Sequence, residues 1–197
     1  MALGRVARGR LETILTPLAD RLAAGGVTPD QLTLAGLLLT GLSVFFYWLG
    51  GAWLFAAAAS LMAGGFLDML DGALARRTGR LSRAGAFLDS VADRVSDTLV
   101  AVGYLLTGVV QPLLALLMLA TSMLVSYSRA RGESLGVRLA DVGLGERGVR
   151  LLIVIVATLT AYIYPQALNI SAAVLTVLAG FTVVERFLHT LEELGLS

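Results

Sequence analysis

Uncharged and charged stretches alternate regularly along the chain. No Asp, Glu, Lys or Arg occurs within 31–67, 98–128 or 151–184. A helix needs about 20 apolar residues to cross a bilayer, so each stretch is long enough for two crossings. Each also has glycine or proline turn signals near its middle: Gly50-Gly51, Gly108 to Pro112, and Tyr164-Pro165. The pattern predicts an all-α integral membrane protein with six transmembrane helices, paired as three hairpins.

The predicted spans cover approximately 31–49, 52–76, 85–107, 111–131, 147–164 and 169–189. They are preceded by residues 1–28, in which charged residues alternate with leucines and isoleucines at helical spacing. This spacing is typical of an amphipathic helix lying in the membrane interface, and a frayed soluble leader is the alternative. We expect residues 1–197 to form a single membrane domain.

The composition agrees with a membrane protein and excludes several other classes. Hydrophobic residues make up 57% of the 197 residues, and the mean hydropathy is +0.82. A chain this apolar is not disordered. Its net charge of +1 argues against nucleic-acid binding. The chain contains neither cysteine nor lysine, so disulfides, thiolate chemistry and lysine chemistry are excluded.

All of the charge gathers in four segments: 1–30, 68–97, 129–150 and the tail from Glu185. Because a hairpin returns to the side from which it started, we expect all four segments at one membrane face. They contain every arginine of the chain, and the positive-inside rule makes that face cytoplasmic. We therefore expect a multi-pass protein of the cell membrane, with both termini cytoplasmic and without a cleavable signal peptide.

Five aspartates crowd the second and third predicted spans. Asp68 and Asp71 lie three residues apart. Asp89, Asp93 and Asp97 follow at intervals of four. Both spacings place side chains on one face of a helix, and the short connection makes the two spans antiparallel neighbours. Carboxylates at a membrane edge repel one another, and their oxygens suit Mg²⁺, Mn²⁺ or Ca²⁺. Solvated charges at helix ends are the alternative.

These aspartates belong to a longer motif. Asp68-x-x-Asp71-Gly72-x-x-Ala75-Arg76 is followed, after eight residues, by Gly85-x-x-x-Asp89-x-x-x-Asp93. The motif resembles the signature of the CDP-alcohol phosphotransferase family at every fixed position. Members of this family have six spans and a cytoplasm-facing site. They displace CMP from a CDP-linked lipid by attack of an alcohol on the lipid-side phosphorus.

The resemblance implies roles for individual residues. Two divalent ions, Mg²⁺ or Mn²⁺, would be held by four aspartates: Asp68, Asp71, Asp89 and Asp93. Asp93 would also be the proton acceptor for the attacking hydroxyl. The donor, CDP-diacylglycerol or CDP-archaeol, would contact a second set: Asp30, Thr33, Gly72, Arg76 and Ser82. Asp97 is expected to be hydrogen-bonded or paired with an arginine, and relatives form homodimers.

Arginines at three predicted span ends indicate the nature of the acceptor. Arg129 ends span four, Arg147 begins span five and Arg186 lies near the end of span six. Arginine binds phosphate through forked, charge-assisted hydrogen bonds, so we expect these three to bind a phosphorylated acceptor. Positive-inside anchoring is the alternative for each of them, and it is favoured for Arg138 and Arg150.

The same region resembles one branch of the family, the phosphatidylinositol-phosphate and archaetidylinositol-phosphate synthases. The resemblance lies in residues 126–133, in the run 141–147, and in Arg186 with His189. Arg129 stands where bacterial members usually carry lysine. The branch implies transfer of a phosphatidyl or archaetidyl group to myo-inositol phosphate, with release of CMP.

Other functions fit parts of the pattern. Glycerol 3-phosphate is also a phosphorylated acceptor, whereas free serine or inositol would leave the arginines without a ligand. A cation transporter would use the aspartates as an ion pathway. Transporters of that kind tend to place their charges near the bilayer midplane, and the acids of this chain lie at one face.

Overall fold

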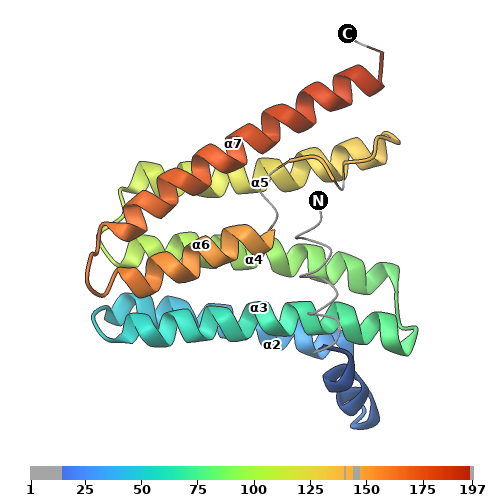
Figure 1. Ribbon diagram of the computed structural model, residues 1–197, viewed down its shortest axis with the longest axis horizontal. Helices are drawn as coiled ribbons and strands as arrows, with labels where there is room; N and C mark the ends of the chain where they lie inside the picture. The colour runs from blue at the N-terminus through green and yellow to red at the C-terminus, as the bar shows by residue number, and fades with distance from the viewer. Residues whose placement is uncertain (1–14, 140, 144–146, 196–197) are drawn as a thin grey trace. The chain divides into compact units, whose positions relative to one another are not determined.

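The computed structural model describes residues 15–139, 141–143 and 147–195, and within them every regular element is a helix. A first helix covers residues 15–24. Six longer helices follow (Figure 1): α2 Pro29–Leu49, α3 Trp53–Thr78, α4 Arg83–Leu106, α5 Pro112–Ser134, α6 Arg147–Thr160 and α7 Ala167–Glu193. Each of these lies over one predicted range, although α6 ends at Thr160 and not at 164. The predicted interfacial segment 1–28 falls partly on residues 1–14, which lie outside the described residues.

Four of the described helices have the length and composition of membrane spans: α2, α3, α5 and α7. The other two fall short for different reasons. α6 has only 14 residues, and α4 carries aspartates and arginines along its first half. The described part of the chain is therefore an all-helical membrane protein.

Local sequence signals explain where helices begin and end. At the start of α2, the Thr28 N–H donates to Gln31 Oε1 at 3.0 Å and the Gln31 N–H donates to Thr28 Oγ1 at 3.4 Å. Gly50-Gly51, with positive φ at both residues, ends α2 and begins the turn into α3. Ser82 caps α4, because its Oγ accepts the Gly85 N–H at 2.9 Å.

The chain divides into two compact units. The first lies within Met1–Gly41 and Ser60–Ser96, and the second lies within Leu42–Ala59 and Asp97–Ser197. α2, α3 and α4 each contribute residues to both.

In the first unit, the helix over residues 15–24 packs on α2 and α3. Its contact is a buried apolar cluster formed by five side chains: Leu15, Ala19, Leu32, Leu70 and Leu74. Burial of apolar surface stabilises this contact. The segment before α2 is thereby attached to the helix that carries the first two motif aspartates.

An ion pair joins the helix over residues 15–24 to α3. Arg77 Nε lies 2.8 Å from Asp20 Oδ1, and Arg77 Nη2 lies 3.1 Å from Asp20 Oδ2. The hydrogen bond from Arg77 lowers the pKa of the Asp20 carboxyl below its usual range. Both side chains are about half exposed, so this pair fixes geometry more than it adds stability.

In the second unit, α7 packs against α5 and α6 (Figure 1). Two buried hydroxyl pairs join its helices: Tyr47 to Thr158 at 2.5 Å, and Tyr104 to Ser171 at 3.0 Å. The two tyrosine rings meet edge to face at 5.7 Å. Gly103 leaves the space that the Tyr47 ring fills. Polar groups buried between membrane helices are commonly satisfied by such cross-helix partners.

A glycine pair sets the spacing of α2 and α3 in the first unit. A Cβ on Gly64 would lie 2.9 Å from the carbonyl oxygen of Gly36, and a Cβ on Gly36 would lie 3.0 Å from the carbonyl oxygen of Gly64. Both contacts are with main chain, so neither helix can make room by rotating a side chain. This is the close small-residue packing common between membrane helices.

We expect Gly64→Ala to destabilise the protein, because the added methyl overlaps the main chain of α2 at a cost of about 1–3 kcal/mol. Gly41→Ala is the matched control, since no neighbouring atom lies within 4 Å of its Cβ position. Alanine there favours the helix by up to about 1 kcal/mol. Thermal unfolding in detergent should give a lower midpoint for Gly64→Ala and an equal or higher midpoint for Gly41→Ala. Equal midpoints for the two variants would contradict the packing argument.

Candidate active site

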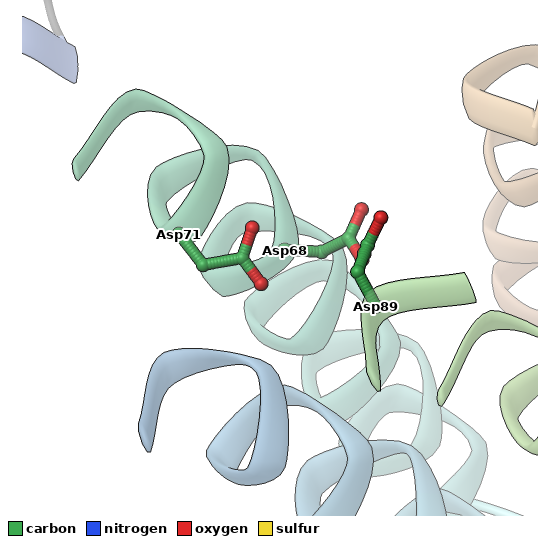
Figure 2. Close-up of side chains that lie close together, drawn as sticks. All are labelled: Asp68, Asp71 and Asp89. Atoms are coloured by element: carbon green, nitrogen blue, oxygen red, sulfur yellow. The ribbon is translucent and has the colours of Figure 1, made fainter. Parts of the chain in front are cut away.

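Three carboxylates from two helices of the first unit converge. Asp68 and Asp71 extend from α3 and Asp89 extends from α4, and their side chains approach one another (Figure 2). One oxygen of each lies within 4.8 Å of the others. Asp71 is buried, whereas Asp68 and Asp89 are half-buried. The structure thus brings together three of the four aspartates predicted to bind metal.

A hydrogen bond from a third helix orients the buried member of this group. The Thr33 hydroxyl of α2 donates to Asp71 Oδ2 at 2.5 Å. Thr33 is itself buried. Thr33, predicted to contact the donor, therefore holds the Asp71 carboxylate in position.

The converging carboxylates repel one another. Two unit charges separated by 4.8 Å repel by roughly 3.5 kcal/mol at an effective dielectric constant of about 20. Three carboxylates form three such pairs, in a setting where unpaired charges are costly. Carboxylate oxygens are hard ligands that suit Mg²⁺, Mn²⁺ or Ca²⁺. The residues present therefore fit a divalent metal ion.

Asp93 is not part of this close group. Its side chain is 20% exposed, and its Oδ2 lies 3.4 Å from Nη1 of Arg94. Arg94 also donates to the carbonyl oxygen of Ser90 at 2.7 Å. Asp93, predicted to be both a metal ligand and the base, thus has different surroundings from the three converging aspartates.

Asp30 and Ser82, two predicted donor contacts, both lie close to Gly85. A Cβ on Gly85 would lie 3.1 Å from Ser82 Oγ and 3.5 Å from Asp30 Oδ1. Both polar side chains are exposed. The absence of a side chain on the motif glycine therefore keeps a space open between a hydroxyl and a carboxylate.

Gly72 and Arg76, the other two predicted donor contacts, lie one turn apart on α3. Arg76 Nη1 is 3.3 Å from the position that a Cβ on Gly72 would take, so the guanidinium folds back over the glycine. A pocket of about 190 Å³ adjoins Arg76, and its remaining lining is Leu15, Thr16, Ala73 and Arg77. A lining that combines guanidinium groups with apolar side chains suits an anionic group attached to hydrocarbon.

The three arginines predicted to bind the acceptor all belong to the second unit. Arg129 is exposed, and its Nε donates to Glu133 Oε1 at 2.9 Å. Arg147 is the first residue of α6. Residues 144–146, which precede it in the predicted acceptor run 141–147, lie outside the described residues.

Arg186 is the buried member of this set, with 8% of its surface exposed. Its Nε donates to the carbonyl oxygen of Val142 at 3.0 Å, and its Nη1 donates to the carbonyl oxygen of Val125 at 2.5 Å. These bonds tie α7 to α5 and to the segment that leads toward α6. Arg186 therefore has a structural task in addition to any contact with a ligand.

Arg150, for which the sequence favours membrane anchoring, faces the interior of the second unit instead. Its side chain is 12% exposed, its Nη1 donates to Ser122 Oγ at 2.7 Å, and its Nη2 lies 3.4 Å from Asp97 Oδ2. Arg186 interacts electrostatically with both Arg150 and Arg129. Guanidinium groups from α5, α6 and α7 thus share one neighbourhood.

The buried face of α6, which the structure shows and the sequence does not, explains why Arg150 faces inward. Arg150 lies one turn before Val154 and two turns before Thr158, and both of these are buried on α6. Spacings of four and eight residues place all three on the same face of a helix. Asp97, expected to be hydrogen-bonded or arginine-paired, is the partner of Arg150.

The family model of CDP-alcohol phosphatidyltransferases matches residues 26–184. The chain belongs to this family. The archaetidylinositol phosphate synthase of Methanothermobacter thermautotrophicus is 38% identical over 185 residues, which cover 93% of this chain and 92% of the relative. The phosphatidylinositol phosphate synthase of Mycobacterium tuberculosis is 36% identical over 195 residues, which cover 94% and 88% of the two chains.

Solved structures of this CDP-alcohol phosphatidyltransferase family resemble the chain over most of its length. A crystal structure of the Mycobacterium tuberculosis phosphatidylinositol phosphate synthase with CDP-DAG bound superposes with a TM-score of 0.80 at 34% identity, covering 91% of this chain and 94% of the other. A second structure of that enzyme, in complex with manganese and citrate, gives a TM-score of 0.76 at 31% identity, with coverages of 89% and 88%. The chain is thus a transferase of phospholipid synthesis.

We expect Asp89→Asn to weaken Mn²⁺ binding about tenfold or more, because even groups that only support a metal ligand affect affinity about 10- to 100-fold. The measurement is a titration of the purified protein with Mn²⁺, following the electron paramagnetic resonance signal of the free ion. Glu192→Gln is the control, because it removes an exposed carboxylate outside the group. Equal affinities in the two variants would argue against a metal at these carboxylates.

Proposed function

We propose that the protein transfers a phosphatidyl or archaetidyl group from a CDP-lipid to a hydroxyl of myo-inositol phosphate and releases CMP. The archaeal and mycobacterial relatives described above carry the names of synthases of this kind, which supports the proposal. The observation within the structure that carries it is that three arginines gather along α5: Arg150 donates to Ser122, Arg186 donates to Val125, and Arg129 lies one turn farther along the same helix. Three guanidinium groups are suited to a phosphorylated acceptor.

Four aspartates would hold two Mg²⁺ or Mn²⁺ ions: Asp68, Asp71, Asp89 and Asp93. Bound divalent ions supply charge neutralisation and orientation for an in-line displacement at phosphorus. The convergence of three of these carboxylates supports the assignment. Manganese in a structure of the mycobacterial neighbour supports a divalent metal as well.

The CDP group of the donor would lie along the first unit. Arg76 would pair with the diphosphate, and the missing side chain of Gly72 would let the nucleotide approach the main chain of α3. Asp30 and Ser82 would contact the donor close to Gly85, where the structure leaves space. Thr33 would act through Asp71, to which it is hydrogen-bonded.

In the reaction, the acceptor hydroxyl oxygen forms a bond to the lipid-side phosphorus. The bond between that phosphorus and the bridging oxygen of the diphosphate breaks, and CMP leaves with the electron pair. Asp93 takes the proton of the attacking hydroxyl. Its place outside the close group of three carboxylates and its partial exposure suit it to this task.

The arginines of the second unit would bind the phosphate of the acceptor. Their contacts include two carboxylates, Asp97 with Arg150 and Glu133 with Arg129. A phosphate monoester carries a charge of about −1.5 to −2, which would balance the remaining positive charge. Arg147, at the start of α6, would add a further cation. Free inositol or serine offers no such group.

Glycerol 3-phosphate is the second candidate acceptor, because it also carries a phosphate monoester. The same arginines would serve it equally well. The names of the relatives favour the inositol phosphate. Because the chain belongs to a family of transferases, the cation-transporter alternative is no longer needed to explain the aspartates.

We also propose that α4 and α6 cross the membrane, which gives six spans in three hairpins. With 24 residues, α4 is about 36 Å long, enough for a hydrocarbon core of about 30 Å. With 14 residues, α6 is about 21 Å long, so the turn that follows Thr160 would have to complete its crossing. The charged segments, the active site and both termini would be cytoplasmic, by the positive-inside rule. Residues 1–28 would lie in the interface, and residues 1–197 would act as one domain in a homodimer.

We expect the purified protein with Mg²⁺ and CDP-diacylglycerol or CDP-archaeol to release CMP when myo-inositol 1-phosphate is added. Glycerol 3-phosphate, inositol and serine are tested in parallel. Release with glycerol 3-phosphate alone would keep the metal and donor sites and overturn the acceptor. Folded protein that releases CMP with none of the four would overturn the proposed function.

We expect Asp93→Asn to lower kcat by about 10²- to 10⁴-fold, because the proton of the acceptor hydroxyl loses its acceptor. Binding of CDP, followed by equilibrium dialysis, should remain close to that of the unaltered protein. The amide keeps the size of the carboxylate, so the fold should persist. Unchanged CMP release by this variant would contradict the assignment of the base.

A further inference from the structure

A closed hydrogen-bond network holds Arg150 in the second unit. Its members come from three helices: Asp97 of α4, Ser122 of α5 and Arg150 of α6. Arg150 Nη1 donates to Ser122 Oγ at 2.7 Å, and the Ser122 hydroxyl donates to Asp97 Oδ2. Arg150 Nη2 lies 3.4 Å from the same carboxylate oxygen. The serine therefore links the arginine to the carboxylate, in addition to their direct contact.

This network is largely shielded from solvent. The side chains of Arg150 and Asp97 are 12% and 23% exposed, and Ser122 is buried. Charged partners that are hydrogen-bonded and removed from water hold one another in a defined orientation. The direction of the Arg150 guanidinium is therefore set by Asp97 and Ser122.

Arg150 lies where its charge would otherwise be unfavourable. It is in the first turn of α6, where the helix macrodipole disfavours cations. Arg186 carries a like charge and interacts electrostatically with Arg150. Both effects push the guanidinium away from its present place, and the Asp97 carboxylate opposes them. Replacing the Asp97 carboxylate by a neutral group would remove the attraction that opposes this repulsion, so the Arg150 guanidinium would lose its orientation.

Arg150 also keeps unused capacity for a ligand. Its Nη1 and Nη2 contact the network, whereas its Nε is buried and makes no hydrogen bond to any part of the chain that the structure describes. A buried donor of this kind is costly unless a partner satisfies it. Arg150 Nη1 and Nη2 each carry a second N–H, and N–H groups of this kind are suited to the oxygens of a phosphate group.

We infer that Asp97 and Ser122 are positioning residues for the acceptor: they hold Arg150 so that its remaining N–H groups bind the acceptor phosphate. Neither residue contacts the acceptor in this arrangement. The inference rests on the proposed function, because it concerns the phosphorylated acceptor of that reaction. It adds that affinity for this acceptor depends on a carboxylate and a hydroxyl that act through Arg150.

The test measures initial rates of CMP release at a saturating concentration of CDP-lipid and increasing myo-inositol 1-phosphate. We expect Asp97→Asn to raise the KM for the inositol phosphate about tenfold, in line with the loss of a hydrogen bond to a charged group. The KM for the CDP-lipid and the kcat should change less than about twofold, since a residue that only positions the acceptor arginine leaves donor binding and the chemical step in place. Ser122→Ala should shift the same KM in the same direction.

Two controls separate positioning from a general loss of structure. Glu185→Gln removes an exposed carboxylate of the same unit and should leave every kinetic constant unchanged. In an Arg150→Lys background, Asp97→Asn should raise the KM little further, because both changes interrupt the same interaction. If Asp97→Asn does not fold, Ser122→Ala decides the question, and Ser122→Thr, which keeps the hydroxyl, should restore the lower KM.

The two proposals fail in different ways. If the unaltered protein shows no saturable dependence on any phosphorylated acceptor, the proposed function is overturned. If it saturates with the inositol phosphate but Asp97→Asn and Ser122→Ala leave that KM unchanged, the inference alone is overturned. A rise in the KM values of donor and acceptor together, or full additivity with Arg150→Lys, would also overturn it.

Discussion

Repulsion between like charges is the constraint on which the rest of this structure depends. Asp68, Asp71 and Asp89 are brought to one point although each pair repels. Helix packing has to hold them there, and the close approach of α2 and α3 at the glycine pair does so from one side. The Thr33 hydroxyl fixes the buried carboxylate in the same region. A bound cation would relieve this repulsion, so the same crowding that is unfavourable alone would favour a metal ion.

In the second unit the like charges that lie close together are positive, because they belong to arginines. Arg186 is held by two main-chain carbonyl oxygens, which accept hydrogen bonds without cancelling its charge. Arg150 is held by a carboxylate and a hydroxyl. These partners hold both guanidinium groups in place, and in the proposed function the remaining positive charge would attract the acceptor phosphate.

The sequence predicts those features that depend on local geometry. The three-residue spacing of Asp68 and Asp71 fixes a common face, and a short connection suffices to bring Asp89 near them. Asp93 is one turn farther along α4, a displacement of about 6 Å, so it does not join the group of three. The six helix ranges follow from hydropathy, and α6 alone is clearly shorter than expected because the chain turns after Thr160.

The contacts of Thr33 and Arg150 cannot be predicted from the periodicity of the sequence, because they depend on how one helix is rotated against another. An arginine near a membrane face looks the same in sequence whether it points to lipid headgroups or into the protein. Only the buried positions Val154 and Thr158 show which face of α6 turns inward. The same limit applies to Asp97, whose partner is 53 residues away along the chain.

The division of charge also bears on selectivity, which is a difference between affinities. The donor carries a diphosphate and the acceptor a monophosphate, so an arginine group of unchecked charge would attract both. Asp97 and Glu133 lower the net charge around Arg150 and Arg129. In the proposed function, the weaker positive field that remains would suit a monophosphate, and the diphosphate would bind at the carboxylates with their divalent metal. On that proposal, acidic residues beside the acceptor arginines would lower the affinity of the arginines for the diphosphate of the donor.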